Sequence, residues 1–103
     1  MYLQNNQNSL ERRRLMQLAR EYRQKGYKVI INPTPEKLPS SLAECSLDMI
    51  AVSGSKVVAA EVRTKENLTL NGSEDLRYIS KSVSQLPGWE FELVITNSRK
   101  KNY

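Results

Sequence analysis

The chain has 103 residues, enough for one domain with a single modest core and too few for a second domain. Lys and Arg outnumber Asp and Glu by 16 to 11, and the resulting net charge of +5 favours a polyanionic partner such as nucleic acid. The absence of His and the single cysteine, Cys45, exclude Ser-His-Asp and Cys-His catalysis, internal disulfides and His-based or thiolate zinc sites. Catalysis would therefore rest on carboxylates, Lys, Arg and Tyr, and a metal-assisted carboxylate site is the main chemistry that remains.

The first segment predicts a polar start followed by an amphipathic helix. Residues 1–8 are expected to be loosely ordered, and a helix is predicted from Asn8 or Ser9 to Lys25, where Gly26 ends it. Apolar residues at helical spacing predict its buried stripe: Leu15, Leu18, Ala19 and Tyr22.

Glu11 falls on this stripe, one turn before Leu15. Asn8 and Glu11 have the spacing of a capping box, which favours a local structural role. The other faces of the helix are rich in arginine. Such a run is usually a solvated surface, but it can also contact phosphates, and the candidates for nucleic-acid binding are Arg13, Arg14 and Arg20.

A first strand is predicted from Gly26 to Ile31. Three prolines between Asn32 and Ser46 then exclude a continuous strand or a long helix, leaving room for a short helical turn at Ser40 to Glu44.

A β-hairpin of two buried strands is predicted next, from Leu47 to Val52 and from Lys56 to Lys65, around a Ser-Gly-Ser turn. Charge is unexpected inside it, yet Asp48 opens the first strand. Alternation along the second strand places three charged side chains on one face: Glu61, Arg63 and Lys65. A carboxylate on each of two paired strands could hold one divalent cation. Alternatively, Asp48 caps a turn or pairs with Arg63, and Glu61 marks the solvated end of an edge strand.

The last third of the chain predicts a helix and a strand. A polar connection at residues 66–72 leads to a second helix that opens at Ser73-Glu74-Asp75, with the acids placed as the helix dipole prefers. Its outer face carries Lys81, a further candidate for nucleic-acid binding. A strand follows from Trp89 to Asn97.

The order of Asp48, a hairpin's length of chain and Glu61-Val62-Arg63 resembles the PD-(D/E)xK nuclease superfamily, especially its archaeal Holliday junction resolvase-like branch. Gly26-Tyr27 and Val29 after a helix, and the proline-rich segment before Asp48, strengthen the resemblance. It implies an α/β fold with a restriction endonuclease-like core, a central mixed β-sheet flanked by helices in the order αβββαβ. The domain would span residues 9–97, between a loose start at 1–8 and a basic tail at 98–103.

The resemblance also implies roles for individual residues. Asp48 and Glu61 would bind Mg²⁺ or Mn²⁺, Glu11 would be the acid of the first helix that faces the metal, and Arg63 takes the place of the motif lysine. A guanidinium does not deprotonate in proteins and cannot act as a base, so Arg63 would stabilise phosphate charge instead. Lys65, on the same face, could substitute for the motif lysine.

The leading hypothesis is therefore a metal-dependent DNA endonuclease-like domain that hydrolyses phosphodiester bonds, with branched DNA as one substrate. The alternative is a catalytically inactive module of the same fold, in which Arg63 replaces the metal and the domain binds DNA or a protein partner. A third hypothesis is a small assembly protein without a nucleic-acid role. The family implies DNA and a second copy of the chain as partners. No small-molecule cofactor is expected, and with no recognisable signal peptide or membrane span we expect a cytoplasmic protein.

Overall fold

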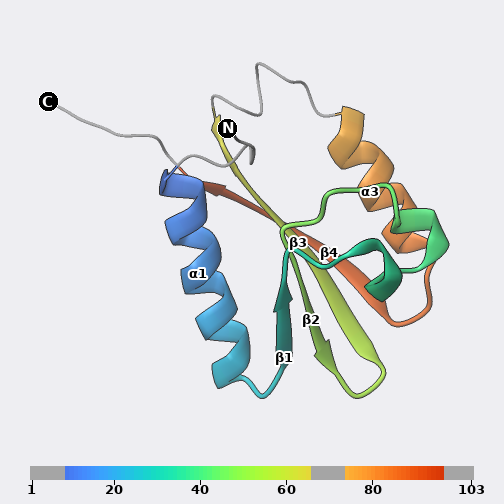
Figure 1. Cartoon of the computed structure of the whole chain (residues 1–103), viewed down its shortest axis with the longest axis horizontal. Helices are drawn as coiled ribbons and strands as arrows, with labels where there is room; N and C mark the ends of the chain where they lie inside the picture. The colour runs from blue at the N-terminus through green and yellow to red at the C-terminus, as the bar shows by residue number, and fades with distance from the viewer. Residues whose placement is uncertain (1–8, 66–73, 97–103) are drawn as a thin grey trace, which may run out of the picture.

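A computed structural model of the chain describes residues 9–65 and 74–96. Its elements, drawn in Figure 1, are helix α1 (Ser9–Gln24), strand β1 (Lys28–Ile31), 3₁₀ turns η1 (Pro35–Lys37) and η2 (Ser40–Leu42), strands β2 (Met49–Ser53) and β3 (Lys56–Thr64), helix α3 (Glu74–Ser84) and strand β4 (Trp89–Thr96). This order and the mixed sheet confirm the predicted α/β class.

The strands form one sheet in the order β1-β2-β3-β4. β1, β2 and β3 pair antiparallel, and β4 pairs parallel to β3. β3 and β4 run beyond the shorter strands, as Figure 1 shows, so the last residues of β3 have β4 on one side and no strand on the other. That open edge is where the charged residues of the hairpin lie.

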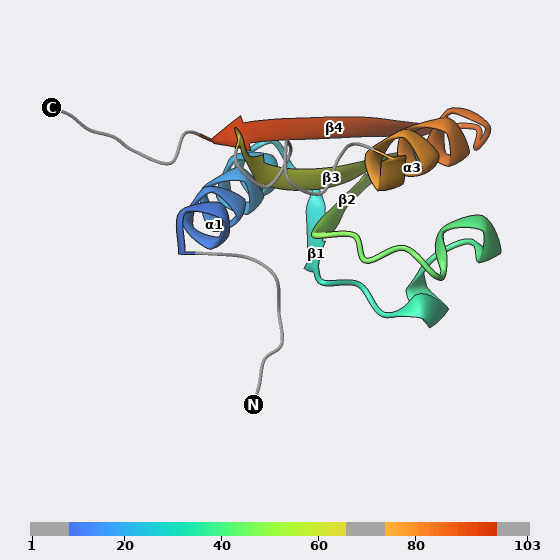
Figure 2. The same ribbon diagram turned by 90° about the horizontal axis from the view of Figure 1, so that it is seen from above.

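Each face of the sheet has its own core. One cluster joins α1 to alternate residues of β2 and β3, including Leu15, Met49 and Val62. The other joins α3 and η2 to the intervening residues, including Ile50 and Ala59. The helices therefore cover opposite faces, and Figure 2 shows them toward opposite ends of β4.

Gly26 ends α1 as predicted, with φ +96. The N–H of Gly26 donates to the carbonyl of Arg23, and the N–H of Tyr27 donates to that of Tyr22, which is the Schellman pattern of a helix C-terminus. Because a left-handed φ strains any residue with a Cβ, glycine suits this position. The chain turns directly into β1.

The predicted boundaries differ from the observed ones by only a few residues. The second helix begins at Glu74 and ends at Ser84, and the helical turn after the prolines is a 3₁₀ turn that ends at Leu42. On β4, Phe91 packs against the core while Leu93 and Ile95 are exposed. The predicted loose segments 1–8 and 98–103, and the connection at 66–72, lie outside the described residues. No helix in the described ranges is long and apolar enough to cross a membrane.

Candidate active site

The hairpin brings Asp48 and Glu61 together through a reciprocal pair of hydrogen bonds. The backbone N–H of Asp48 donates to Oε2 of Glu61 at 2.9 Å. The backbone N–H of Val62 donates to Oδ2 of Asp48 at 2.7 Å. Asp48 is 7% exposed and Glu61 is fully buried. Two carboxylates are thus held in one buried place by the main chain of the strands that carry them.

Glu11 takes the next position along the same open edge of β3. The pairing of β2 with β3 ends at Met49 and Ala60, so the N–H groups that follow have no strand partner on that side. The side chain of Asp48 accepts from Val62, and Oε2 of Glu11 accepts from the N–H of Thr64 at 2.6 Å. Carboxylates therefore replace the missing strand, which removes the cost of leaving buried N–H groups without acceptors.

Arg63 reaches both members of the acidic pair. Its Nη1 lies 2.6 Å from Oε1 of Glu61 and 3.8 Å from Oδ2 of Asp48. Its Nη2 donates to Oδ2 of Asp75, on the first turn of α3, at 3.2 Å. The Arg63 side chain is 21% exposed, so it covers the pair from the solvent side.

One oxygen of the pair faces the guanidinium. Oε1 of Glu61 is buried and forms an ion pair with Nη1 of Arg63 at 2.6 Å. Burial, and next the charge of Asp48, raise the pKa of Glu61 well above its usual range, although Arg63 opposes the rise. The three acids around Arg63 also raise the pKa of the guanidinium, against the effect of its burial. Arg63 thus lies between three carboxylates, while burial and the neighbouring Asp48 favour a proton on Glu61.

The sequence comparison decides which fold family this site belongs to. A family model described as REase_AHJR-like, for restriction endonuclease-like domains of the archaeal Holliday junction resolvase type, matches residues 3–103. The chain belongs to the AHJR-like family. Comparisons with curated proteins and with solved structures found no match.

The family resemblance implies a divalent cation, so the fit of such an ion to these residues is a test of the site. Mg²⁺ is commonly held by one or two carboxylates together with waters and substrate phosphates. Asp48 and Glu61 supply that donor set, and the buried Oε1 of Glu61 already faces a cationic group, the guanidinium of Arg63. Within residues 9–65 and 74–96, no group of three or more His, Cys, Asp or Glu side chains is placed to hold a metal ion. A two-carboxylate Mg²⁺ site fits, provided that Arg63 gives way.

The structure brings some of the predicted site residues together and sets others apart. Asp48, Glu61 and Arg63 share the site. Glu11 lies on the α1 face, bonded to Thr64. Lys65 follows β3 directly and is exposed. Asn8, the expected capping partner of Glu11, lies outside the described residues.

Asp75 is a site residue that the sequence does not predict. An acid at the start of a helix is explained by the helix dipole alone, which requires no partner for it. Only the packing of α3 against the sheet brings it within reach of Arg63. The sequence signal was weak, since many helices begin with an acid.

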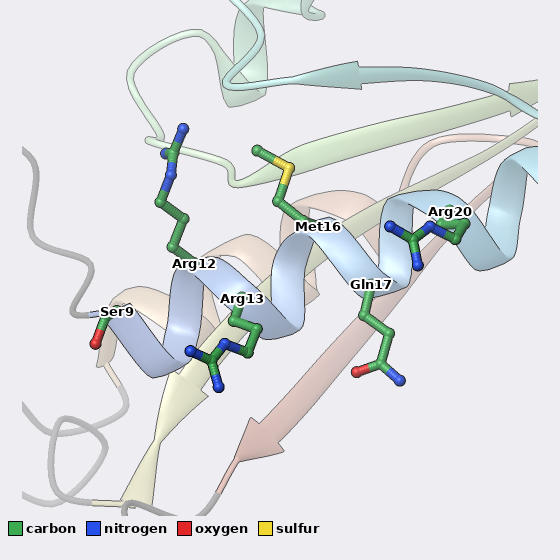
Figure 3. A pocket seen from close by; sticks show the side chains of 6 residues that line it. All are labelled: Ser9, Arg12, Arg13, Met16, Gln17 and Arg20. Atoms are coloured by element: carbon green, nitrogen blue, oxygen red, sulfur yellow. The ribbon is translucent and has the colours of Figure 1, made fainter.

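Three arginines of α1 lie around a hollow of about 580 Å³ on its outer side, shown in Figure 3. It is lined by Ser9, Arg12, Arg13, Met16, Gln17 and Arg20. Arg13 and Arg20 are exposed there. Arg14 is partly buried, and its Nη1 lies 3.9 Å from Oε2 of Glu21. Lys81 is exposed on α3, away from this surface. Arg12 therefore joins the predicted Arg13 and Arg20 on one surface, and Arg14 is not among the residues that line it.

Cys45 packs against the core beneath α3. Burial, and then the negative charge of Glu61, raise the pKa of its thiol. Because the thiolate is the nucleophilic form, these surroundings disfavour a nucleophilic role for Cys45 and suit a packing role.

Proposed function

We propose that this domain hydrolyses phosphodiester bonds in DNA with the help of a divalent metal ion. The observation that supports the proposal is the buried pair of Asp48 and Glu61, held by hydrogen bonds from the backbone, in which burial and the charge of Asp48 hold the pKa of Glu61 far above its usual range. Such a pair is costly for a small core and is typical of a cation site. Membership of a nuclease-fold family supports the same proposal.

Each residue has a defined part in this proposal. Asp48 and Glu61 would hold Mg²⁺ or Mn²⁺ through their carboxylate oxygens. A bound Mg²⁺ lowers the pKa of a coordinated water and polarises a phosphate. Arg63, once released from the pair, neutralises charge on the scissile phosphate, and the exposed Lys65 adds positive charge at the same end of β3. Arg12, Arg13 and Arg20 contact the DNA backbone without reading its sequence.

The position of Arg63 supports a second candidate function. Nη1 of Arg63 lies 2.6 Å from Oε1 of Glu61, at the place where a metal would be held. In an inactive binding module, the guanidinium would replace the metal permanently. DNA would then bind through the arginines of α1 and would not be cut.

A cleavage assay separates the two functions. Linear, flapped and four-way DNA would be incubated with Mg²⁺ or Mn²⁺ and the native chain, Asp48→Asn, Arg63→Lys or the control Lys56→Gln. Lys56 is an exposed residue of β3 that pairs with Glu90, at the other end of the strand from the site. Asp48→Asn keeps an oxygen that can accept from Val62, so its effect would report the removal of the charge.

The expected result is cutting by the native chain and the control, and none by Asp48→Asn. Cutting only by Arg63→Lys would show that the arginine blocks an otherwise intact site. If all four proteins leave DNA intact but retard it in a gel, the binding module is the correct function. A homodimer, which the family implies, would be tested separately by sedimentation of the native chain alone and with four-way DNA.

A further inference from the structure

Asp75 holds Arg63 from outside the acidic pair. Its Oδ2 accepts from Nη2 of Arg63 at 3.2 Å, and its Oδ1 accepts from the backbone N–H of Leu76 at 2.8 Å. The second bond orients the carboxylate from its own helix. The Asp75 side chain is 59% exposed, so, unlike Asp48 and Glu61, it keeps its charge in contact with water.

The two terminal nitrogens of Arg63 are thus divided between two environments. Nη1 faces the buried pair, and Nη2 faces the exposed acid on α3. A divalent cation at Asp48 and Glu61 would repel the guanidinium from that side, because like charges a few ångströms apart interact strongly where water is scarce. The hydrogen bond to Asp75 does not involve the pair and can persist when Arg63 no longer pairs with Glu61.

We propose that Asp75 is a positioning residue for Arg63. The guanidinium of Arg63 stays hydrogen-bonded to Asp75 when a divalent cation binds Asp48 and Glu61. This inference rests on the proposed metal-dependent function and adds a residue to it. Arg63 then remains beside the site, where it can contact a phosphate. It also keeps an acidic partner after the cation has displaced it from Glu61.

The test is a double-mutant cycle with metal affinity as the readout. Binding of Mn²⁺ would be measured by titration calorimetry, without DNA, for the native chain, Asp75→Asn, Arg63→Gln and the double variant. If the two residues are coupled, Asp75→Asn weakens Mn²⁺ binding by about threefold to tenfold in the native background and by less than about twofold in Arg63→Gln. The cycle removes the direct attraction of the Asp75 charge for the metal, because that attraction is the same in both backgrounds.

Two further variants complete the design. Glu90→Gln removes an exposed acid paired with Lys56 away from the site, and it is expected to leave Mn²⁺ affinity unchanged. Asp75→Glu keeps the carboxylate and is expected to restore most of the native affinity. Melting curves of every variant would establish that it folds, so that a loss of affinity is not a loss of structure.

The outcomes are distinct. A loss of affinity on Asp75→Asn that disappears in Arg63→Gln and is rescued by Asp75→Glu supports the inference. An equal loss in both backgrounds overturns it and leaves the metal site standing. Mn²⁺ binding by Arg63→Gln but not by the native chain also overturns it, because Asp75 then fails to hold the arginine away. Absence of binding in all variants overturns the inference together with the proposed metal dependence.

Discussion

The backbone N–H of Thr64 donates a hydrogen bond to Oε2 of Glu11 at 2.6 Å, joining the end of β3 to the first turn of α1 across 53 residues of sequence. Both residues are buried. One step earlier along the same strand edge, the N–H of Val62 donates to Asp48. Two acids that the family resemblance assigns to an active site therefore also complete the backbone hydrogen bonding of the strand that carries Glu61.

Removal of the Glu11 acceptor is expected to destabilise the domain. Glu11→Ala leaves the buried N–H of Thr64 without this partner and should lower the free energy of unfolding by about 1–3 kcal/mol. Glu11→Gln keeps an oxygen at the same distance along the side chain and should cost less. Urea denaturation would measure both. Glu36→Ala, at an exposed acid of η1, is the control, and an equal cost for it and Glu11→Ala would contradict the prediction.

Two substitutions of Asp48 are expected to distinguish its role in stability from its role in metal binding. Asp48→Asn keeps an acceptor for Val62 but loses the charge, so it should bind Mn²⁺ at least about tenfold more weakly while remaining folded. Asp48→Ala loses both and should in addition lower the free energy of unfolding by about 1–3 kcal/mol. Calorimetry and urea denaturation would give the two quantities. Equal unfolding free energies for Asn and Ala would show that the bond to Val62 contributes nothing.

Stability in the absence of added metal is expected to depend on pH through Glu61. Its surroundings raise the pKa from the ordinary value of 4.5 to about 8. Between these values the folded chain holds a proton on Glu61 that the unfolded chain releases, so the free energy of unfolding falls as pH rises through this window. Glu61→Gln lacks this contribution and should gain stability relative to the native chain from pH 4.5 upward, with the gain levelling off above about 8.

Melting temperatures of the native chain and Glu61→Gln would be compared between about pH 4 and 9, a range that spans both pKa values, in the presence of a chelator. The difference between the two curves isolates Glu61 from the other titrating groups. Parallel curves would show that Glu61 ionises normally. Added Mn²⁺ should remove most of the native slope, because a cation favours the ionised carboxylate.

The outer surface of α1 is expected to contribute sequence-independent affinity for DNA. Replacing Arg13 and Arg20 together by Gln should weaken binding to any duplex and reduce the slope of log affinity against log salt by about 2, one unit for each phosphate that these side chains neutralise. Fluorescence anisotropy at several salt concentrations would measure both effects. Arg14→Gln is the matched control, because Arg14 is partly buried near Glu21, and an equal change for this variant would refute the assignment.

Much of the fold followed from local patterns in the sequence. The hairpin could be predicted because β-branched runs flank a Ser-Gly-Ser turn, and alternation then placed Glu61 and Arg63 on one face. The end of α1 could be predicted because Gly26 is the residue that best tolerates a left-handed conformation there. These features depend on neighbours in the chain, which a single sequence displays directly.

The parts that could not be predicted depend on tertiary contacts. The bond from Thr64 to Glu11 and the pairing of Arg63 with Asp75 both require helices to pack at particular places on the sheet. Periodicity identified the buried stripe of α1 that includes Glu11, but not the strand N–H that it meets. The apolar Leu93 and Ile95 on β4 are exposed, and burial at such positions likewise depends on where the helices pack on the sheet.

The pairing of β2 with β3 has one further consequence. Met49 lies opposite Ala60, and Asp48 and Glu61 follow at the open end, away from the Ser-Gly-Ser turn. A shift of one residue between these strands would turn alternate side chains to the other face and carry Glu61 into the apolar layer beneath α1. Misaligned chains would lose the acidic pair altogether. Under the proposed function, cation affinity would therefore report whether a refolding chain has aligned its central hairpin correctly.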